Sequence, residues 1–165
     1  REAGLAWIPE QPYTPGSWGY VGGEALRRSG TGWLGSASDI LGTKNDPVFQ
    51  TQRVGIESFR ADVPDGTYSV YLYWAELDAA RQREALAYNL GADGAQHQYT
   101  GRRFDVSVNG RKVLENFSIA AEVGFSRAMV RKAEVIVRDG QGLRVDFGRI
   151  EGEPVLNAIR IYRNH

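Results

Sequence analysis

The sequence contains no cysteine, which excludes disulfide bonds and zinc sites built on thiolates. This absence is compatible with any cellular compartment. An excess of charge is lacking as well, because 20 basic and 20 acidic residues cancel. Proteins that neutralise phosphates need a basic excess, so no nucleic-acid partner is expected. No apolar run approaches the roughly 20 residues of a membrane helix, so no membrane partner is expected either.

Histidine is scarce, with only His97 and His165, and there is no G-x-S-x-G motif. A hydrolase triad needs a histidine base held beside its nucleophile, so histidine-dependent catalysis is not expected. Glycosidases need only two carboxylates, and the candidate acids are Glu76, Asp78, Asp105, Glu151 and Glu153. With 20 acids on a charge-balanced surface, some pairs lie close by chance. The sequence therefore indicates no catalytic constellation in this domain.

Signals for a cofactor are weak. Residues 30–35 match G-x-G-x-x-G, but a dinucleotide site needs a strand before this motif and a helix after it, and neither is predicted. No spacing typical of an EF-hand is present. We expect no cofactor, although a structural calcium ion is left open, with Asn45, Asp46, Asp62 and Asp65 as candidate oxygen ligands.

Short strands joined by turns dominate the remaining pattern. Apolar and polar residues alternate over 58–63, 104–108 and 143–147, and β-forming residues fill 67–75. Another strand is expected over 135–138. Asn109-Gly110 is a strong hairpin signal, and the last strand is expected over 155–162. This pattern predicts an all-β domain, a two-sheet antiparallel β-sandwich of jelly-roll or galactose-binding-like type.

Two segments depart from the strand pattern. Residues 1–35 are rich in tryptophan and glycine and are expected to form a leader of loops that packs on a sandwich domain at 36–165. Residues 78–102 form a long polar insertion, with a possible short helix at 78–90. The first residue is arginine, which indicates a piece of a longer protein.

Aromatic residues offer a chemistry suited to sugars, because indole and phenol rings stack on the apolar faces of sugar rings. Trp74 lies in phase with Tyr68 and Leu72 and is expected in the core. The aromatic residues in loop-like segments are candidates either for sugar stacking or for anchoring the loops. They are Trp7, Trp18, Tyr20, Trp33, Tyr88 and Tyr99.

Five motifs, in order over about 38–162, resemble the malectin domain family. They are DPVFQTQR at 46–53, PDGTYSV at 64–70, WAE at 74–76, RFDVSVNG at 103–110 and NAI at 157–159. The leader resembles the segment that precedes such domains in bacterial family 2 glycoside hydrolases, often β-galactosidases. The resemblance implies a carbohydrate-binding accessory domain near the C-terminus of such an enzyme, in the bacterial periplasm or secreted.

The family's stacking residues are not retained. Val54 and the Asp78-Ala79 pair stand where the family has aromatic residues, whereas its acid before the last strand has counterparts in Glu151 and Glu153. We expect a glycan of galactoside or glucoside type to bind the loops at 36–46, 78–102 and 150–154. The predicted binding residues are Asp39, Arg53, Glu76, Asp78, Tyr88, Tyr99, Glu151 and Glu153.

An alternative is left open. The domain would then be a structural module that packs on the catalytic domain of its parent chain, or on a dimer partner, without binding sugar. The loss of the family's aromatic residues and the tryptophan-rich leader favour this alternative.

Overall fold

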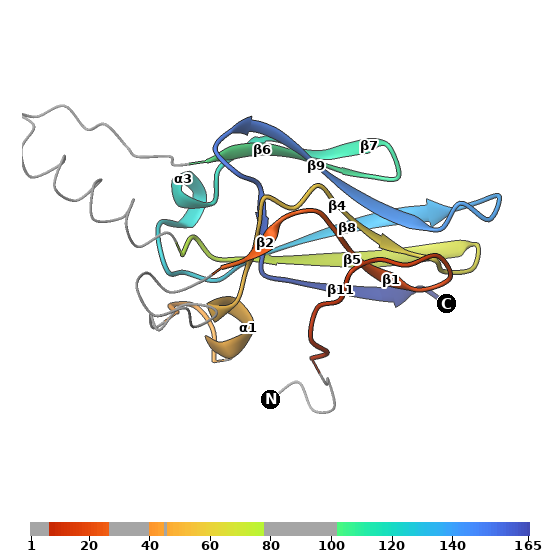
Figure 1. Cartoon of the computed structure of the whole chain (residues 1–165), viewed down its shortest axis with the longest axis horizontal. Coiled ribbons are helices and arrows are strands. Elements are labelled where there is room, and N and C mark those ends of the chain that lie inside the picture. Colours follow the sequence, from red (N-terminus) through yellow and green to blue (C-terminus); the bar gives the residue numbers. More distant parts are fainter. Residues whose placement is uncertain (1–6, 27–39, 45, 78–101) are drawn as a thin grey trace, which may run out of the picture.

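Two antiparallel sheets face one another in the computed structural model, which describes residues 7–26, 40–44, 46–77 and 102–165 (Figure 1). The larger sheet has the order β1 (Trp18–Val21), β4 (Ser58–Ala61), β9 (Leu143–Glu151), β6 (Arg103–Val108) and β7 (Arg111–Phe117). The smaller one has the order β11 (Ala158–Arg163), β5 (Gly66–Trp74) and β8 (Met129–Val137). The predicted all-β sandwich is confirmed.

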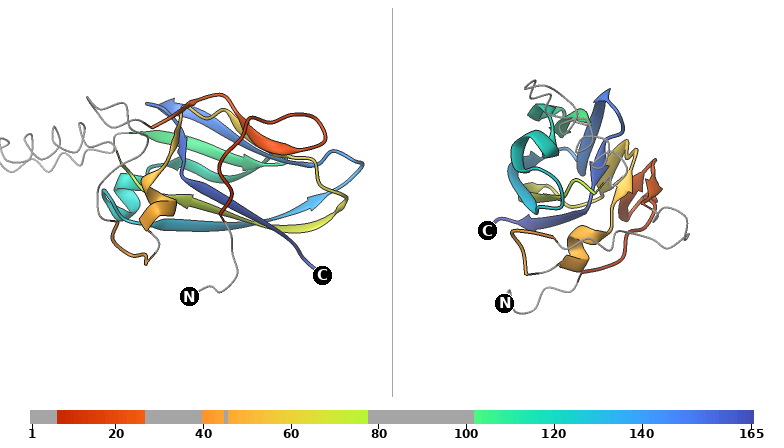
Figure 2. Two further views of the ribbon diagram at one scale, coloured as in Figure 1. Left: turned by 60° about the horizontal axis from the view of Figure 1, so that its bottom comes forward. Right: turned by 90° about the vertical axis from the view of Figure 1, so that its left-hand side faces the viewer.

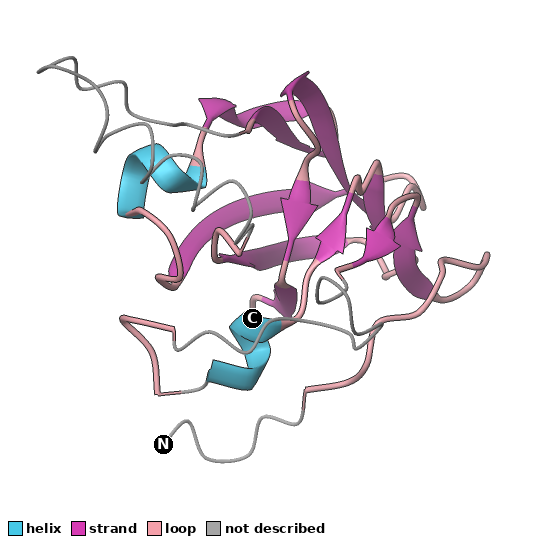
Figure 3. Ribbon diagram, turned by 60° about the vertical axis from the view of Figure 1, so that its left-hand side comes forward, coloured by secondary structure: helices cyan, strands magenta, loops and turns pink. Residues whose placement is uncertain are grey.

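A third, small sheet lies at one end of the sandwich, in the order β10 (Val155–Leu156), β3 (Arg53–Val54) and β2 (Glu24–Ala25). Two five-residue helices, α1 (Asp46–Gln50) and α3 (Ile119–Val123), lie toward the same end (Figures 2 and 3). Ser118 caps α3, because its hydroxyl accepts a hydrogen bond from the Ala121 amide. We call this end of the sandwich the loop end; the β4–β5, β6–β7 and β8–β9 turns lie at the other (Figure 1).

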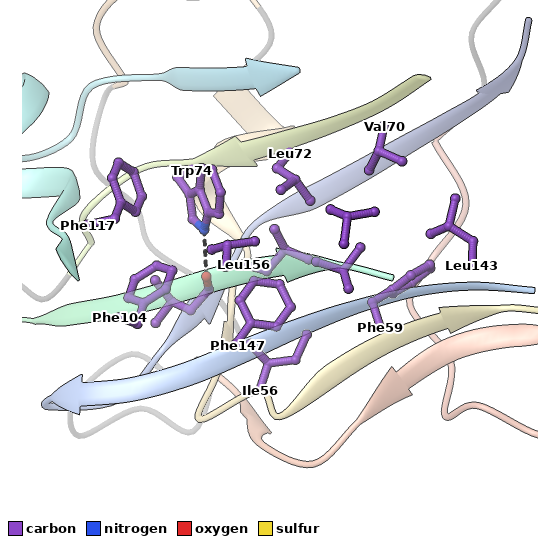
Figure 4. Packing of buried hydrophobic residues seen from close by; sticks show 14 of the residues in the cluster. Ile56, Phe59, Val70, Leu72, Trp74, Phe104, Phe117, Leu143, Phe147 and Leu156 are labelled. Atoms are coloured by element: carbon purple, nitrogen blue, oxygen red, sulfur yellow. Dashed lines mark hydrogen bonds between the residues drawn. The ribbon is translucent and has the colours of Figure 1, made fainter. Parts of the chain in front are cut away.

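The core fills the space between the two large sheets (Figure 4). Trp74 is fully buried, as expected, and its indole Nε1 donates a 2.6 Å hydrogen bond to the carbonyl of Val155. The alternating residues of β6 meet it from the opposite sheet, with Phe104 6.1 Å from Trp74 between ring centroids. A second, smaller cluster lies on the other face of β5, where Tyr73 packs on Phe49 of α1.

The Asn109-Gly110 hairpin is confirmed. Both residues have positive φ, 46° and 81°, as a two-residue type I′ turn requires. The Asn109 side chain fixes the turn to the neighbouring strand, because its Oδ1 accepts from the Arg144 amide at 2.7 Å and its Nδ2 donates to the Gly142 carbonyl at 3.0 Å.

Three expectations about individual segments were wrong. The leader is not only loop, because β1 within it pairs with β4 at the edge of the five-stranded sheet. The strand expected over 135–138 begins earlier, at Met129, because residues 129–134 continue the pairing with β5. The strand expected over 155–162 is two strands. Before Asn157 the chain forms β10 in the small sheet, and after Asn157 it forms β11 beside β5.

Candidate functional site

The loop end holds a buried ion pair at its centre. The carboxylate Oε2 of Glu76 lies 2.7 Å from Nε of Arg102, and their side chains are 2% and 8% exposed. Glu76 follows β5, and Arg102 immediately precedes β6. A second nitrogen of Arg102, Nη1, donates a 2.7 Å hydrogen bond to the carbonyl of Glu153. Arg102 therefore ties the chain after β5 to the loop at 151–154.

Two of the predicted acids present their side chains to solvent beside this ion pair. Glu153 is half-exposed and forms an ion pair with Arg149, four residues earlier on β9. Glu151 is exposed and lies opposite Arg103 in the β6–β9 register. Phe125, which is half-buried, pairs with Glu76 through an isolated backbone bridge. Carboxylates, guanidinium groups and an aromatic residue are thus gathered at one end.

Glu76 itself is placed differently from Glu151 and Glu153. Its carboxylate is buried and bound to Arg102, so it holds the arginine in position and is not presented to a ligand. Arg102 was missed by the sequence reasoning. The available signal was its position, because Glu76 and Arg102 lie close to the two ends of the long insertion.

Arg53 is directed to the leader. Its guanidinium forms an ion pair with Glu10 at 2.5 Å, donates to the Gly23 carbonyl at 2.8 Å and stacks 3.6 Å from the ring centroid of Tyr20. Its side chain is only 11% exposed. These contacts make Arg53 a structural link between β3 and the leader.

Four predicted binding residues, Asp39, Asp78, Tyr88 and Tyr99, lie outside the described residues, as do Trp33 and the helix expected within 78–90. Among the other loop aromatics, Trp18 stacks on Phe59, and Trp7 packs edge-on against Tyr73 at 5.2 Å. Trp18, Tyr20 and Trp7 are thus placed as anchors of the leader.

Four hydrogen bonds converge on the side chain of Asn157 near the loop end, and we call this group the Asn157 node. The Asn157 Oδ1 accepts from the Ala75 amide at 3.0 Å and from Gln52 Nε2 at 3.1 Å. Its Nδ2 donates to the carbonyls of Phe49 and Thr51, both at 2.9 Å. Residues of three motifs quoted from the sequence, at 46–53, 74–76 and 157–159, are therefore joined by the hydrogen bonds of the Asn157 side chain. Their shared role at this point is to hold the fold together.

Within 7–26, 40–44, 46–77 and 102–165, no three acidic or histidine side chains lie close enough together to hold a metal ion. Asp62 accepts hydrogen bonds from the Tyr13 hydroxyl and the Gly16 amide, and Asp65 accepts one from the Gly140 amide. No helix in these ranges is long and apolar enough to cross a membrane.

Solved structures with the same fold include two chains from Bacteroides uniformis. They are a β-glucuronidase (29% identity, TM-score 0.79) and β-glucuronidase 2 covalently bound to cyclophellitol-6-carboxylate aziridine (29% identity, TM-score 0.77). Each match covers 99% of this chain but only 16% of the glucuronidase chain. The chain is therefore similar to a small domain of a larger glycoside hydrolase.

A more distant match, to a chain in the structure of the plant peptide RALF23 in complex with FER and LLG2, has a TM-score of 0.64 at 15% identity. It covers 95% of this chain and 42% of that one, and it shows likeness of fold alone. No curated protein matches the chain in sequence. The family model of the malectin domain matches residues 13–159, which include β1 of the leader and the Asn157 node. The chain belongs to the malectin domain family.

Proposed function

We propose that this domain is a non-catalytic carbohydrate-binding module of a larger glycoside hydrolase, and that it binds glycans at its loop end. The observation that carries the proposal is the position of the 151–154 segment. It presents Glu151 and Glu153 from a malectin fold, and Arg102 fixes its backbone from beneath. The predicted contribution of Asp39, Asp78, Tyr88 and Tyr99 to the same site remains part of the proposal.

The chemistry of the exposed groups suits sugar hydroxyls. A carboxylate accepts several hydrogen bonds and a guanidinium donates up to five, so Glu151, Glu153 and Arg149 can serve vicinal hydroxyls. Because Glu153 and Arg149 are already paired, each can change partner without leaving a buried charge. We expect an affinity on the order of millimolar to micromolar, since few groups contact the ligand.

The parent enzyme is part of the proposal. The resemblance in sequence suggests a β-galactosidase of family 2, whereas the structures matched are β-glucuronidases, so galactosides, glucosides and glucuronides are all candidate ligands. We propose a periplasmic or secreted parent from a bacterium. The domain supplies binding and the catalytic step belongs elsewhere in the chain, so aryl glycosides should not be hydrolysed by the domain alone.

A glycan array followed by titration calorimetry tests the proposal. Arg149→Gln and Glu153→Gln should weaken binding severalfold, because each removes a hydroxyl partner. Arg144→Gln is the matched control: Arg144 lies on the same strand, is 49% exposed where Arg149 is 60% exposed, and also pairs with an acid, Asp146. Failure to bind any galactoside, glucoside or glucuronide would refute the proposed function.

A further inference from the structure

The two outward faces of the sandwich differ in chemistry. On the five-stranded sheet, the strand alternation turns charged and polar residues outward, and these pair with one another, as in Arg144–Asp146 at 2.8 Å and Lys112–Asp105 at 3.2 Å. Such a face is well suited to water. On the β11–β5–β8 sheet, the outward residues include tyrosines and aliphatic residues beside the charged Lys132, Glu134 and Arg160. A sandwich that is solvated on both faces would show the polar pattern on both.

The outward residues of the three-stranded sheet that α1 leaves uncovered form what we call the tyrosine face. It consists of Thr67, Ser69 and Tyr71 on β5, Val130, Lys132, Glu134 and Ile136 on β8, and Arg160 and Tyr162 on β11. Lys132 and Glu134 form an exposed ion pair between Val130 and Ile136. Val130, Ile136 and Tyr162 are 43%, 53% and 38% exposed, which places three of the exposed large apolar side chains on one face. Exposed apolar side chains beside tyrosine and arginine are typical of protein interfaces.

The centre of the tyrosine face is held in place by ring contacts. The Arg160 guanidinium lies 4.7 Å from the ring centroids of both Tyr71 and Tyr162. The two rings meet edge to face at 5.9 Å. These side chains are already ordered, so little conformational entropy is lost when a partner covers them. Tyrosine and arginine are also the residue types that dominate the energetics of protein interfaces.

The matched structures are much longer than this domain. This domain corresponds to only 16% of the β-glucuronidase chain, so most of that polypeptide lies outside the matched region. We propose that the tyrosine face is the surface by which this domain docks onto a neighbouring domain of the polypeptide that carries it. The complementary surface offers apolar groups to Val130 and Ile136, acceptors to the tyrosine hydroxyls, and groups of both charge signs to the Lys132–Glu134 pair. The inference rests on the proposed larger chain but not on glycan binding.

The experiment compares the 165-residue domain with the full-length polypeptide by hydroxyl-radical footprinting. Ile136 and Ile150 make a matched pair, because they are 53% and 51% exposed and lie on the outward faces of opposite sheets. In the full-length chain, labelling of Tyr71, Tyr162 and Ile136 should slow severalfold, while labelling of Ile150 stays unchanged. Equal labelling of Ile136 in both contexts would overturn the proposal.

Two variants of the full-length chain add an independent measurement. Ile136→Asp should lower the melting transition of this domain by breaking the docking, and Ile150→Asp should not. Both changes should have similar effects in the isolated domain. Protection that disappears on dilution would instead indicate a second copy of the chain, and protection that needs added glycan would indicate a sugar; either result overturns the docking. Glycan titration of Ile136→Asp reports separately on the loop end, because Ile136 is next to the β8–β9 turn at the other end of the sandwich.

Discussion

Nε of Arg102 lies 2.7 Å from the carboxylate of Glu76, and both residues are buried although they stand at opposite ends of the 78–101 segment. Bringing the two ends of a long connection together costs conformational entropy, and the ion pair helps to hold these ends in place. The bond from Arg102 to the Glu153 carbonyl links them to the proposed glycan site.

Arg102→Met should destabilise the domain by about 3–5 kcal/mol, because it leaves the Glu76 carboxylate buried without its cation. Urea denaturation followed by tryptophan fluorescence measures this effect. The double variant Glu76→Leu/Arg102→Met removes both charges and should recover much of the loss. A double variant no more stable than Arg102→Met would show that the ion pair does not account for the effect.

The control for this prediction is Arg131→Met, which removes an arginine paired with Glu122 on the surface. That pair is 3.3 Å long, with side chains 45% and 50% exposed. Exposed pairs of this kind contribute only about 0–1 kcal/mol. A loss as large as that of Arg102→Met would indicate that the arginine stem, and not burial of the charge, determines the result.

Asn157→Ala should destabilise the domain by about 2–4 kcal/mol, because four partners lose their hydrogen bonds together at the base of the loop end. Asn164→Ala is the comparison, since the Oδ1 of Asn164 accepts one bond, from the Ser69 hydroxyl at 2.9 Å. Thermal unfolding should show a much smaller change for Asn164→Ala. Similar losses for both would mean that the node is not a stabilising unit.

Asp105 should make stability depend on pH in the acid range. The bond from the Asn116 amide, 2.8 Å long, and the neighbouring Lys112 lower the pKa of the Asp105 carboxyl below its usual value of 3.8, against a smaller opposing effect of burial. A carboxyl whose pKa is lower in the folded state stabilises the fold above the unfolded pKa of about 4 and loses this contribution as pH falls further.

Urea midpoints measured between neutral pH and the acid range test this expectation. Asp105→Asn should flatten the acid limb of the curve. Asn116→Gly should preserve it, because Asn116 has a φ of 48°, which glycine adopts readily, and the backbone amide that binds Asp105 remains. An unchanged acid limb in Asp105→Asn would show that other carboxylates determine it.

Gly19→Ala should loosen the leader, because an added Cβ would lie 2.4 Å from the Gln11 carbonyl oxygen and 2.5 Å from the Pro12 carbonyl carbon. Backbone cannot move aside as a side chain does, so we expect a loss of about 1–3 kcal/mol. Near-ultraviolet circular dichroism should report the displaced Trp18. Gly148→Ala is the control, because Gly148 has no left-handed φ and an added Cβ would meet its nearest atom, the Asp105 Cβ, at an ordinary 3.5 Å, so that spectrum should stay unchanged.

The fold was predictable where local pattern decides it. The strands β4, β6 and β9 could be predicted from the alternation of apolar and polar side chains. The turn at Asn109-Gly110 could be predicted from the backbone conformations that these two residues adopt. The break at Asn157 was not predictable in the same way. Apolar residues continue on both sides of it, and the chain changes sheet there because the asparagine side chain bonds to segments more than 80 positions away.

The site was predictable only in part for a related reason. Glu151 and Glu153 were predicted from the order of motifs, and their side chains reach solvent at the loop end. The sequence does not indicate how far an individual side chain is buried. It therefore could not distinguish these two acids from Glu76, whose carboxylate is buried against Arg102. It also could not show that Arg53 is engaged by Glu10, because that pairing depends on how the leader folds back.

The Asn157 node also determines when the domain can finish folding. Its bonds join residues 82 to 108 positions apart, so Phe49, Gln52 and Ala75 leave the ribosome long before the asparagine that binds them. Contacts so distant in sequence form late. During synthesis the loop end therefore stays open to chaperones and proteases until β11 is made, and a chain interrupted before residue 157 would lack the ordered end that we propose as the glycan site.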